Sequence, residues 1–564
     1  MRSIELKSLG RSLVIGLGLL LATGVAQAAP PKVNYLFPAG GQIGQSVEVT
    51  LSGEFPDWPV NIWSDHPGVA ATAGSDKGKV TVQIASDARP SVAWLRFYSA
   101  AGASTLQPFI LGTLAEIEEK EPNNAPSNPQ QVTAGTVING RLQKGGDLDS
   151  FKVTLKQGET LVASLQTHTL LGSPVDSVLQ VCELSERKAL ADAPPQVEAY
   201  ILQQEHDSVG LDPRLAFTAP KDGDYLVRIF GFPSEPNSTI GYSGADSYVY
   251  RLTLTTGPVV LATLPMAAVG SESTKLNYVG YNLPSAGLAS DIPALEGDQS
   301  PVDQRSVTAT HPEALGFVQL ARVESTVLVA APDISLEKPQ PIPVPAVVTG
   351  QLSQPGSIHS FELEVKKGSK LHIAVEGSSL GFPWDPHLSV WDSAGKQLTE
   401  IDDARRERDP QLTFNPPADG KYRVVVRDLN RHGGLDFIYR LNIEQASDFS
   451  LTLSADNFVL PTDKPLEIPV TIDRRDGFAE PIHIRVAGLP EDVSCETVTS
   501  EAKGDSSKSV KLILKAEGDR AMLPDGPIRI EGVAAENQRR RVATFDLAKP
   551  LAGEHTAAWL TIGR

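Results

Sequence analysis

The chain has few cysteines and no clustered histidines, and these shortages exclude several classes of protein. Its 564 residues include two cysteines, Cys182 and Cys495, which lie far apart and are expected to be isolated buried thiols rather than a disulfide framework. The ten histidines are scattered, and no H-E-x-x-H segment or Cys/His cluster has the spacing of a zinc site. A disulfide-stapled scaffold and a zinc enzyme are therefore not expected.

Positive charge is also scarce. Fifty Lys and Arg residues face 68 Asp and Glu residues, which gives a formal net charge of −18. A nucleic-acid partner needs a basic footprint, so none is expected. The acidity suits an open aqueous compartment and leaves carboxylates available for hard cations such as Ca²⁺.

Long apolar runs are missing after the first 28 residues. That initial segment has a basic start at Lys7 and Arg11, an apolar run over residues 13–25, and the small-x-small sequence Ala26-Gln27-Ala28. Such a segment is typical of a secretory signal that is cleaved. We expect cleavage near Ala28 and a secreted, periplasmic or cell-surface protein that does not span a membrane.

Helical periodicity is nearly absent, whereas alternation of apolar and polar residues with period two is common. Residues 46–52, 79–85 and 92–100 alternate in this way between clusters of Gly, Pro, Asp and Ser. This pattern predicts short half-buried strands joined by turns. The expected fold class is all-β, as a tandem array of β-sandwich modules.

An internal repeat with an offset of 210 residues is the most informative feature of the sequence. Gly140-x-Leu142 recurs as Gly350-x-Leu352, and residues 150–155 (SFKVTL) recur as residues 360–365 (SFELEV). Further matches continue after small deletions up to Tyr-Arg-Leu, which ends both copies. Each copy contains two alternating strands around a Gly turn, so the chain is expected to contain a duplicated β-module.

Four segments of the first copy resemble the bacterial pre-peptidase C-terminal (PPC) domain: Glu119–Asn124 (EKEPNN), the Gly-x-Leu strand, Gly146–Phe151 (GDLDSF) and Asp222–Tyr225. The resemblance implies a jelly-roll-like sandwich, as in secreted peptidases and clostridial collagenases. Two other segments vaguely resemble IPT/TIG modules, and the layout looks like that of secreted planctomycete-type proteins. The expected organisation is a signal peptide (1–28), an IPT/TIG-like sandwich (30–115), a first PPC-like sandwich (119–257), a small TIG-like sandwich (258–346), a second PPC-like sandwich (347–446), an immunoglobulin-like sandwich (448–548) and a C-terminal tail (549–564).

The PPC resemblance also implies a calcium site in the first copy only. Carboxylate and amide oxygens from the acidic linker and the D-x-D turn would supply the ligands. The alternative is a solvated linker beside a turn that merely caps a hairpin. This chain has Asn124 at a position where the collagen-binding relatives often carry Asp. One negative charge less would weaken calcium binding. In the second copy, the turn at 356–361 contains no acid, so no metal is expected there. The implied ligands are Glu119, Glu121, Asn123, Asn124, Asp147 and Asp149.

One segment, Gly377–Gly381 (GSSLG), fits the G-x-S-x-G pattern of a nucleophile elbow. That motif requires a helix after the serine, and Pro383 and Pro386 prevent one. No catalytic residue and no cofactor other than Ca²⁺ is therefore expected. The predicted function is an exported, non-catalytic protein that binds an extracellular or envelope protein or polysaccharide. The alternatives are a structural or accessory subunit of an envelope or peptidase complex and, with less support, a secreted peptidase.

Overall fold

The computed structural model describes residues 29–187, 196–233, 241–295, 306–403, 408–517, 523–547 and 555–563. The predicted signal segment, residues 1–28, lies outside the described residues. The all-β expectation is confirmed. Within the described ranges, the helical elements are α1 (His168–Leu171) and two short 3₁₀ turns, η1 (Ser378–Leu380) and η2 (Asp505–Ser507). No described helix has the length and apolar character needed to cross a membrane.

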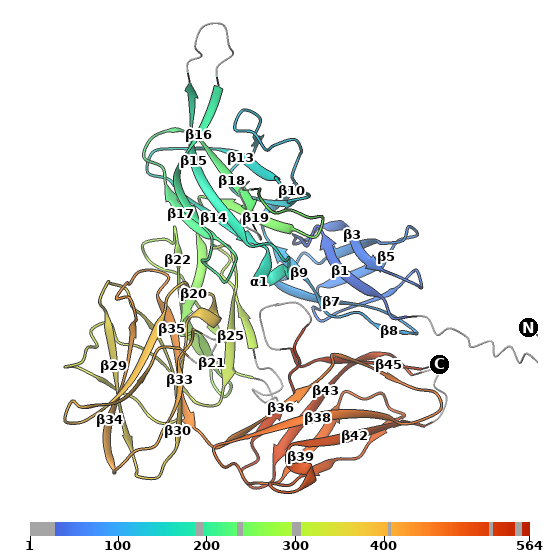
Figure 1. Cartoon of the computed structure of the whole chain (residues 1–564), viewed down its shortest axis with the longest axis vertical. Coiled ribbons are helices and arrows are strands. Elements are labelled where there is room, and N and C mark those ends of the chain that lie inside the picture. Colours follow the sequence, from blue (N-terminus) through green and yellow to red (C-terminus); the bar gives the residue numbers. More distant parts are fainter. Residues whose placement is uncertain are drawn as a thin grey trace, which may run out of the picture.

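Five pairs of sheets follow one another along the chain, and we call them the first to fifth modules (Figure 1). Alternation explains how the strands form. In β6, for example, Val80, Val82 and Ile84 are buried while the intervening residues are not. One sheet of the first module contains, in spatial order, β1 (Lys32–Phe37), β3 (Ser46–Glu54), β6 (Lys79–Ile84) and β5 (Val69–Ala73). The other contains β2 (Gly40–Gln42), β9 (Gln107–Gly112), β7 (Ser91–Ser99) and β4 (Asn61–Ser64), with β8 (Gly102–Ala103) beside β7.

The second and fourth modules have the same strand order in both of their sheets. The second contains β10 (Ala115–Glu118), β12 (Thr136–Arg141), β19 (Val249–Thr255), β14 (Thr160–Gln166), β17 (Arg214–Thr218) and β11 (Gln130–Gln131), β13 (Leu148–Leu155), β18 (Gly223–Gly231), β15 (Ser177–Arg187), β16 (Gln196–Glu205). The fourth contains β26 (Thr326–Val329), β28 (Ala346–Gln351), β35 (Ile438–Gln445), β30 (Leu371–Glu376), β33 (Gln411–Phe414) and β27 (Gln340–Pro341), β29 (Ile358–Val365), β34 (Gly420–Asp428), β31 (Pro386–Asp392), β32 (Gln397–Ile401).

The third module is the smallest, and the fifth closes the chain. The third contains β20 (Val259–Leu264), β22 (Thr274–Tyr281), β23 (Ala289–Ile292) and β21 (Ala267–Val269), β25 (Val318–Val323), β24 (Ser306–Ala309). The fifth contains β36 (Asp448–Leu453), β38 (Leu466–Arg475), β42 (Ser509–Ala516), β40 (Val493–Cys495) and β37 (Asn457–Leu460), β45 (Ala558–Ile562), β43 (Gly526–Ala534), β39 (Ile482–Ala487), β41 (Val498–Ser500), with β44 (Arg540–Val542) beside β43.

The structure differs from the expected segment bounds in three places. Residues 116–118, which fall between the expected first and second modules, belong with Ala115 to β10, which pairs in parallel with β12. Residues 326–341, expected at the end of the third module, supply β26 and β27 to the sheets of the fourth. Within the expected tail, residues 558–562 form β45 between β37 and β43. These strands are short and depend on a distant partner for their hydrogen bonds, so local alternation identifies them poorly.

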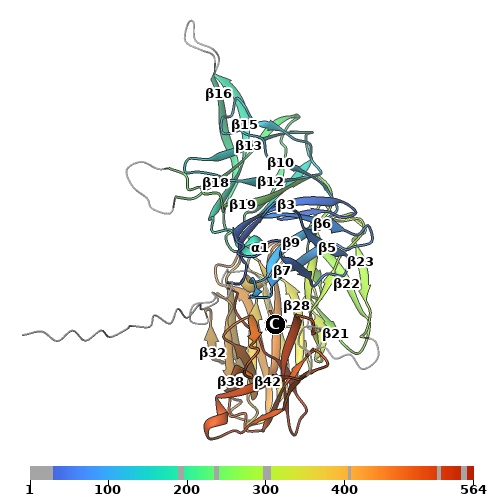
Figure 2. The ribbon, with the colours of Figure 1, turned by 90° about the vertical axis from the view of Figure 1, so that its right-hand side faces the viewer.

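The first and fifth modules, which are far apart in the sequence, pack against each other. Figures 1 and 2 show the blue first module next to the red fifth module. Arg96 Nη1 of β7 lies 3.0 Å from Asp456 Oδ2 in a buried ion pair. The indole of Trp559 contacts Trp63 and Tyr98, with ring centroids 5.7 and 4.8 Å apart. We call this contact the clasp. The array is therefore a closed arrangement, not an extended string.

Candidate functional site

The acidic segment after β10 and the turn before β13 lie together at one end of the second module. Carboxylate oxygens of Glu121, Asp147 and Asp149 all lie within 4.8 Å of one another. Two ligands of one Ca²⁺, each at 2.3–2.6 Å, are separated by at most about 5 Å. Asp147 and Asp149 are buried, whereas Glu121 is exposed. The structure therefore brings together three of the six residues implied by the PPC resemblance, and we call them the acidic triad.

The other implied residues surround the acidic triad in different ways. Asn123 is fully buried, and neither polar atom of its side-chain amide has a hydrogen-bond partner. Its backbone N–H donates to Glu121 Oε2 at 2.9 Å. Asn124 donates its side-chain N–H to Asp147 Oδ1 at 3.1 Å, so this amide nitrogen supports a triad member and is not a ligand atom itself. The backbone N–H of Gln143 donates to the other oxygen of Asp147 at 2.7 Å.

Glu119 faces a tyrosine that sequence reasoning missed. The hydroxyl of Tyr250 lies 2.7 Å from Glu119 Oε2 and 2.6 Å from Asp149 Oδ2. A hydroxyl carries one hydrogen and can donate it to only one carboxylate at a time. The tyrosine begins the Tyr-Arg-Leu segment that recurs in the second copy, and this recurrence was the signal that could have identified it. Gly140 leaves room for the ring, because a Cβ there would lie 2.2 Å from the Tyr250 hydroxyl oxygen.

Burial dominates the electrostatics of this site. Removal from water raises the pKa of Asp149 far above its ordinary value, and the neighbouring Glu119 and Asp147 carboxylates raise it further, against the Tyr250 hydrogen bond. Burial also raises the pKa of Glu119. A hydrogen bond between the Glu119 and Asp149 side chains raises the pKa of Asp149 further and lowers that of Glu119. Clustered carboxylates and unpartnered buried oxygens are costly in an empty protein, and a hard divalent cation would offset this cost.

The fourth module has the same framework without the acids. Ser357 and His359 stand where the second module has Asp147 and Asp149, and His359 Nδ1 lies 2.7 Å from the Tyr439 hydroxyl. Burial lowers the pKa of His359 to about 4, so its imidazole is neutral at physiological pH. The corresponding tyrosines of the two modules therefore have different partners: Tyr250 contacts carboxylates, and Tyr439 contacts a neutral imidazole.

Ser379, the serine of the G-x-S-x-G segment, lies on η1 and donates its hydroxyl to Asp409. Asp409 also accepts the backbone N–H groups of residues 377–379 at 2.8–3.0 Å. Asp212 of the second module accepts the N–H groups of residues 167–169 in the same way, at 2.6–3.1 Å. In both modules the aspartate holds a tight turn together. The hydrogen bond of Ser379 therefore belongs to a repeated turn, and the strand β31 follows it instead of a long helix.

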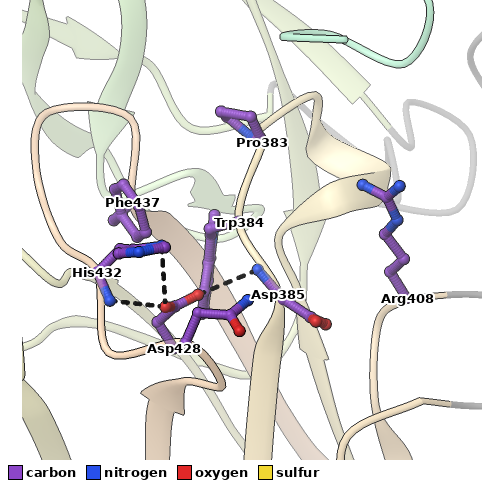
Figure 3. Close-up of a pocket in the computed structure, with 8 residues that line it drawn as sticks. Pro383, Trp384, Asp385, Arg408, Asp428, His432 and Phe437 are labelled. Atoms are coloured by element: carbon purple, nitrogen blue, oxygen red, sulfur yellow. Dashed lines mark hydrogen bonds and ion pairs between the residues drawn. The ribbon is translucent and has the colours of Figure 1, made fainter.

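Two hollows lie beside this turn. A cavity of about 2460 Å³ is lined by residues of all five modules, including Trp94 of the first, His168 of the second, Arg322 of the third, Arg440 of the fourth and Arg475 of the fifth. A smaller cavity of about 320 Å³ lies within the fourth module and is shown in Figure 3. Pro383 and Arg408 line both hollows, so the smaller cavity adjoins the larger one.

One segment of the chain matches a known domain family. Residues 358–428 match the bacterial pre-peptidase C-terminal domain. This match falls on the fourth module, although the motifs that suggested the resemblance are more complete in the second. A probable subtilase-type serine protease of Deinococcus radiodurans is 27% identical over 218 residues, which cover 35% of this chain and 28% of that relative. The chain thus spans just over a quarter of that protease.

The similar solved structures include two from bacterial proteins. One is the PPC domain of Bacillus anthracis collagenase, at 13% identity and a TM-score of 0.16, covering 24% of this chain and 100% of that one. Another is a mixed-linkage glucan utilization protein of Bacteroides ovatus in complex with a heptasaccharide, at 7% identity and a TM-score of 0.13, covering 69% of this chain and 74% of that one. Scores this low do not locate a site in this chain.

Proposed function

We propose that this chain is an exported, non-catalytic binding protein whose modules together hold a protein or polysaccharide outside the cytoplasm. The observation that carries the proposal is the cavity of about 2460 Å³ to which all five modules contribute. Ligand sites occur preferentially where domains meet. A closed arrangement also fixes the relative positions of the contact surfaces, which reduces the entropy lost when a partner binds.

We further propose that the second module takes one Ca²⁺ at the acidic triad. Glu121, Asp147 and Asp149 would supply carboxylate oxygens, and Asn123 an amide oxygen, which suits the preference of calcium for hard oxygen ligands. Bound there, the ion would neutralise buried negative charge and tie the segment after β10 to the turn before β13. Its role in this proposal is structural. Ser357 and His359 replace two of these ligands in the fourth module, so the proposal assigns no ion to that module.

Replacing Tyr250 with Phe is expected to weaken calcium binding about 10- to 100-fold, because groups that orient metal ligands contribute on this scale. The substitution removes the hydroxyl that contacts Glu119 and Asp149 while keeping the buried ring. Calorimetric titration of the full chain with CaCl₂ measures the effect. Tyr439→Phe makes the same change in the fourth module and should leave the affinity unchanged. Equal losses in both variants would show that the tyrosine acts through general stability.

A second candidate function is an accessory chain of a peptidase. It is favoured by the match of residues 358–428 to a domain named for its association with peptidases and by the partial similarity to the Deinococcus protease. In this role the cavity would hold a segment of the enzyme. Copurification of a peptidase from envelope extracts, in stable stoichiometry with this chain, would support the accessory role over an independent binding role.

Two assays with the purified full chain test the proposed binding role. The chain is immobilised and exposed to soluble extracellular proteins and polysaccharides, and we expect saturable retention of one class. In parallel, casein is incubated with the original protein and with Ser379→Ala, and we expect no hydrolysis by either. Sustained hydrolysis that disappears in Ser379→Ala would overturn the non-catalytic proposal. Retention of nothing from any source would overturn the binding role.

A further inference from the structure

The smaller cavity, of about 320 Å³, is built from parts of the fourth module that are distant in sequence. Trp384 and Asp385 come from the segment before β31, Asp428 from the end of β34, and His432 and Phe437 from the connection between β34 and β35 (Figure 3). Its volume lies at the lower end of the range for small-molecule sites and exceeds what a bare ion needs. We call it the rim pocket.

Asp428 places a carboxylate in the wall of the rim pocket. Its side chain is almost completely buried. One carboxylate oxygen accepts the backbone N–H of Asp385 at 3.2 Å, and the other accepts the backbone N–H of His432 at 2.7 Å. These two hydrogen bonds fix the position of the carboxylate in the wall of the pocket. The His432 ring lies 3.8 Å from the same oxygen but is largely exposed to solvent.

Asp385 adds a second carboxylate, and this one lacks a complete set of partners. Its Oδ1 atom is buried and has no hydrogen-bond partner among the described residues. Burial raises the pKa of Asp385, and the carboxylates of Asp403 and Asp428 raise it further. Arg408 acts in the opposite direction, yet it lies on another segment across the opening in Figure 3. Acidic groups therefore outnumber the one arginine in the rim pocket.

The side chains that line the rim pocket suit an organic cation better than a metal ion. In the described ranges, the acidic triad of the second module is the only group of three or more potential ligand residues with converging atoms. Aromatic rings stand beside the two carboxylates: Trp384 and Phe437 have centroids 6.3 Å apart, and Phe437 and His432 have centroids 6.5 Å apart. Aromatic faces attract ammonium and guanidinium groups but add little to the binding of hard metal ions.

We propose that the rim pocket binds the ammonium or guanidinium group of a basic side chain, Lys or Arg, presented by a polypeptide partner. The carboxylates of Asp385 and Asp428 would receive its N–H donors, and Phe437 would border its alkyl stem. The net charge of −18 favours approach of a cationic polypeptide. This inference rests on the proposed binding role and narrows the partner to a basic polypeptide segment.

The duplicated framework provides an internal control for the rim pocket. Asp176 of the second module corresponds to Asp385, since Phe232 donates its N–H to the Asp176 carbonyl as Leu429 does to that of Asp385, at 2.7 and 2.8 Å. The residue after each of these aspartates pairs across the sheet: Ser177 pairs with Gly231 in the second module, and Pro386 pairs with Asp428 in the fourth. The second module therefore has no carboxylate at the position of Asp428, although Asp207 lies near Asp176.

The test measures binding of a fluorescent lysine-rich decapeptide to the full chain, with a glutamate-rich decapeptide as the charge-reversed probe. Asp385→Asn should weaken lysine-peptide binding at least tenfold, because the side chain loses its charge while its backbone contacts remain. Arg408→Gln should strengthen binding by removing the competing positive charge. Asp176→Asn, which removes one acid from the second module, should change the affinity less than twofold. This control separates the rim pocket from general attraction between opposite charges.

Three outcomes would overturn the inference. The first is unchanged lysine-peptide binding in Asp385→Asn. The second is weaker binding in Arg408→Gln together with uptake of the glutamate-rich probe, which would identify an anion site. The third is a preference for glucosamine oligomers over the lysine peptide, which would identify a polysaccharide partner. In each case retention of a macromolecule by the original chain would leave the proposed binding role standing, so the two failures are distinguishable.

Discussion

Replacing Asp149 with Asn is expected to maintain or raise the stability of the calcium-free protein at neutral pH and to abolish its stabilisation by calcium. In the folded protein the pKa of Asp149 is raised above its ordinary value of 3.8, chiefly by burial. The folded state therefore holds a proton that the unfolded state releases, and stability falls as pH rises from that ordinary value towards the raised one. Asparagine keeps the shape of the neutral acid and does not ionise, so this loss is removed.

Calcium should reverse the behaviour of the original protein. At a free concentration of about 100 times Kd, an ion that binds only the folded state adds about 2.7 kcal/mol. Thermal unfolding of the full chain in excess CaCl₂ and in EDTA measures this gain, which should be present in the original and absent in Asp149→Asn. Because binding displaces the proton held by the buried acids, the apparent calcium affinity should increase as pH rises.

The matched control for Asp149 is the corresponding residue of the fourth module, His359. His359→Asn changes the group that contacts Tyr439 and should leave the calcium-dependent gain intact. If the original protein unfolds at the same temperature in CaCl₂ and in EDTA, the calcium proposal fails. If Asp149→Asn is much less stable than the original in EDTA, the sign of the proton linkage is wrong.

Replacing Asp456 with Ala should open the clasp between the first and fifth modules. Arg96 is fully buried, and its Nη1 donates to Asp456 Oδ2 at 3.0 Å and to the Ser104 carbonyl at 2.9 Å. Its Nε and Nη2 atoms have no hydrogen-bond partner. Removing one member of a buried ion pair leaves the other charge buried without a partner, which lowers the free energy of unfolding by about 3–5 kcal/mol. Small-angle scattering should show a larger radius of gyration, and unfolding should lose the cooperativity between the two modules.

Two further variants separate charge burial from simple loss of packing at the clasp. Combining Arg96→Met with Asp456→Leu removes both charges, and it should restore most of the lost stability, because well-packed apolar pairs replace buried ion pairs at little cost. Glu54→Ala breaks an exposed pair with Lys32 and should change stability by about 1 kcal/mol or less. A compact Asp456→Ala protein with unchanged unfolding would contradict the role assigned to the clasp.

The fold class could be predicted from the sequence because strand alternation is local. Residues 79–85 alternate in the sequence, and the strand formed there buries Val80, Val82 and Ile84. The closed arrangement could not be predicted, since the clasp joins Arg96 to a residue 360 positions away and no local pattern records such a contact. For the same reason β45 was placed in a tail: all five of its residues are buried, so it lacks apolar–polar alternation and is identified only by its pairing with β37 and β43.

The candidate site was predicted in part. The D-x-D turn and the acidic segment were identified by resemblance, and the structure brings Glu121, Asp147 and Asp149 together. Tyr250 was missed because it lies about a hundred residues from Asp149 and on a strand of the other sheet of the module, so only the packing of the two sheets brings them together. The rim pocket was missed entirely. Its residues come from segments that become neighbours only when β31 pairs with β34.

The most direct measurement of the difference proposed between the second and fourth modules is the calcium stoichiometry of the full chain, determined by equilibrium dialysis after exhaustive chelation. One tightly bound ion per chain is predicted, and it should disappear when Glu121→Gln and Asp147→Asn are combined. Two ions per chain, none, or one that persists in the double variant would contradict the assignment of a single hard-cation site to the second module.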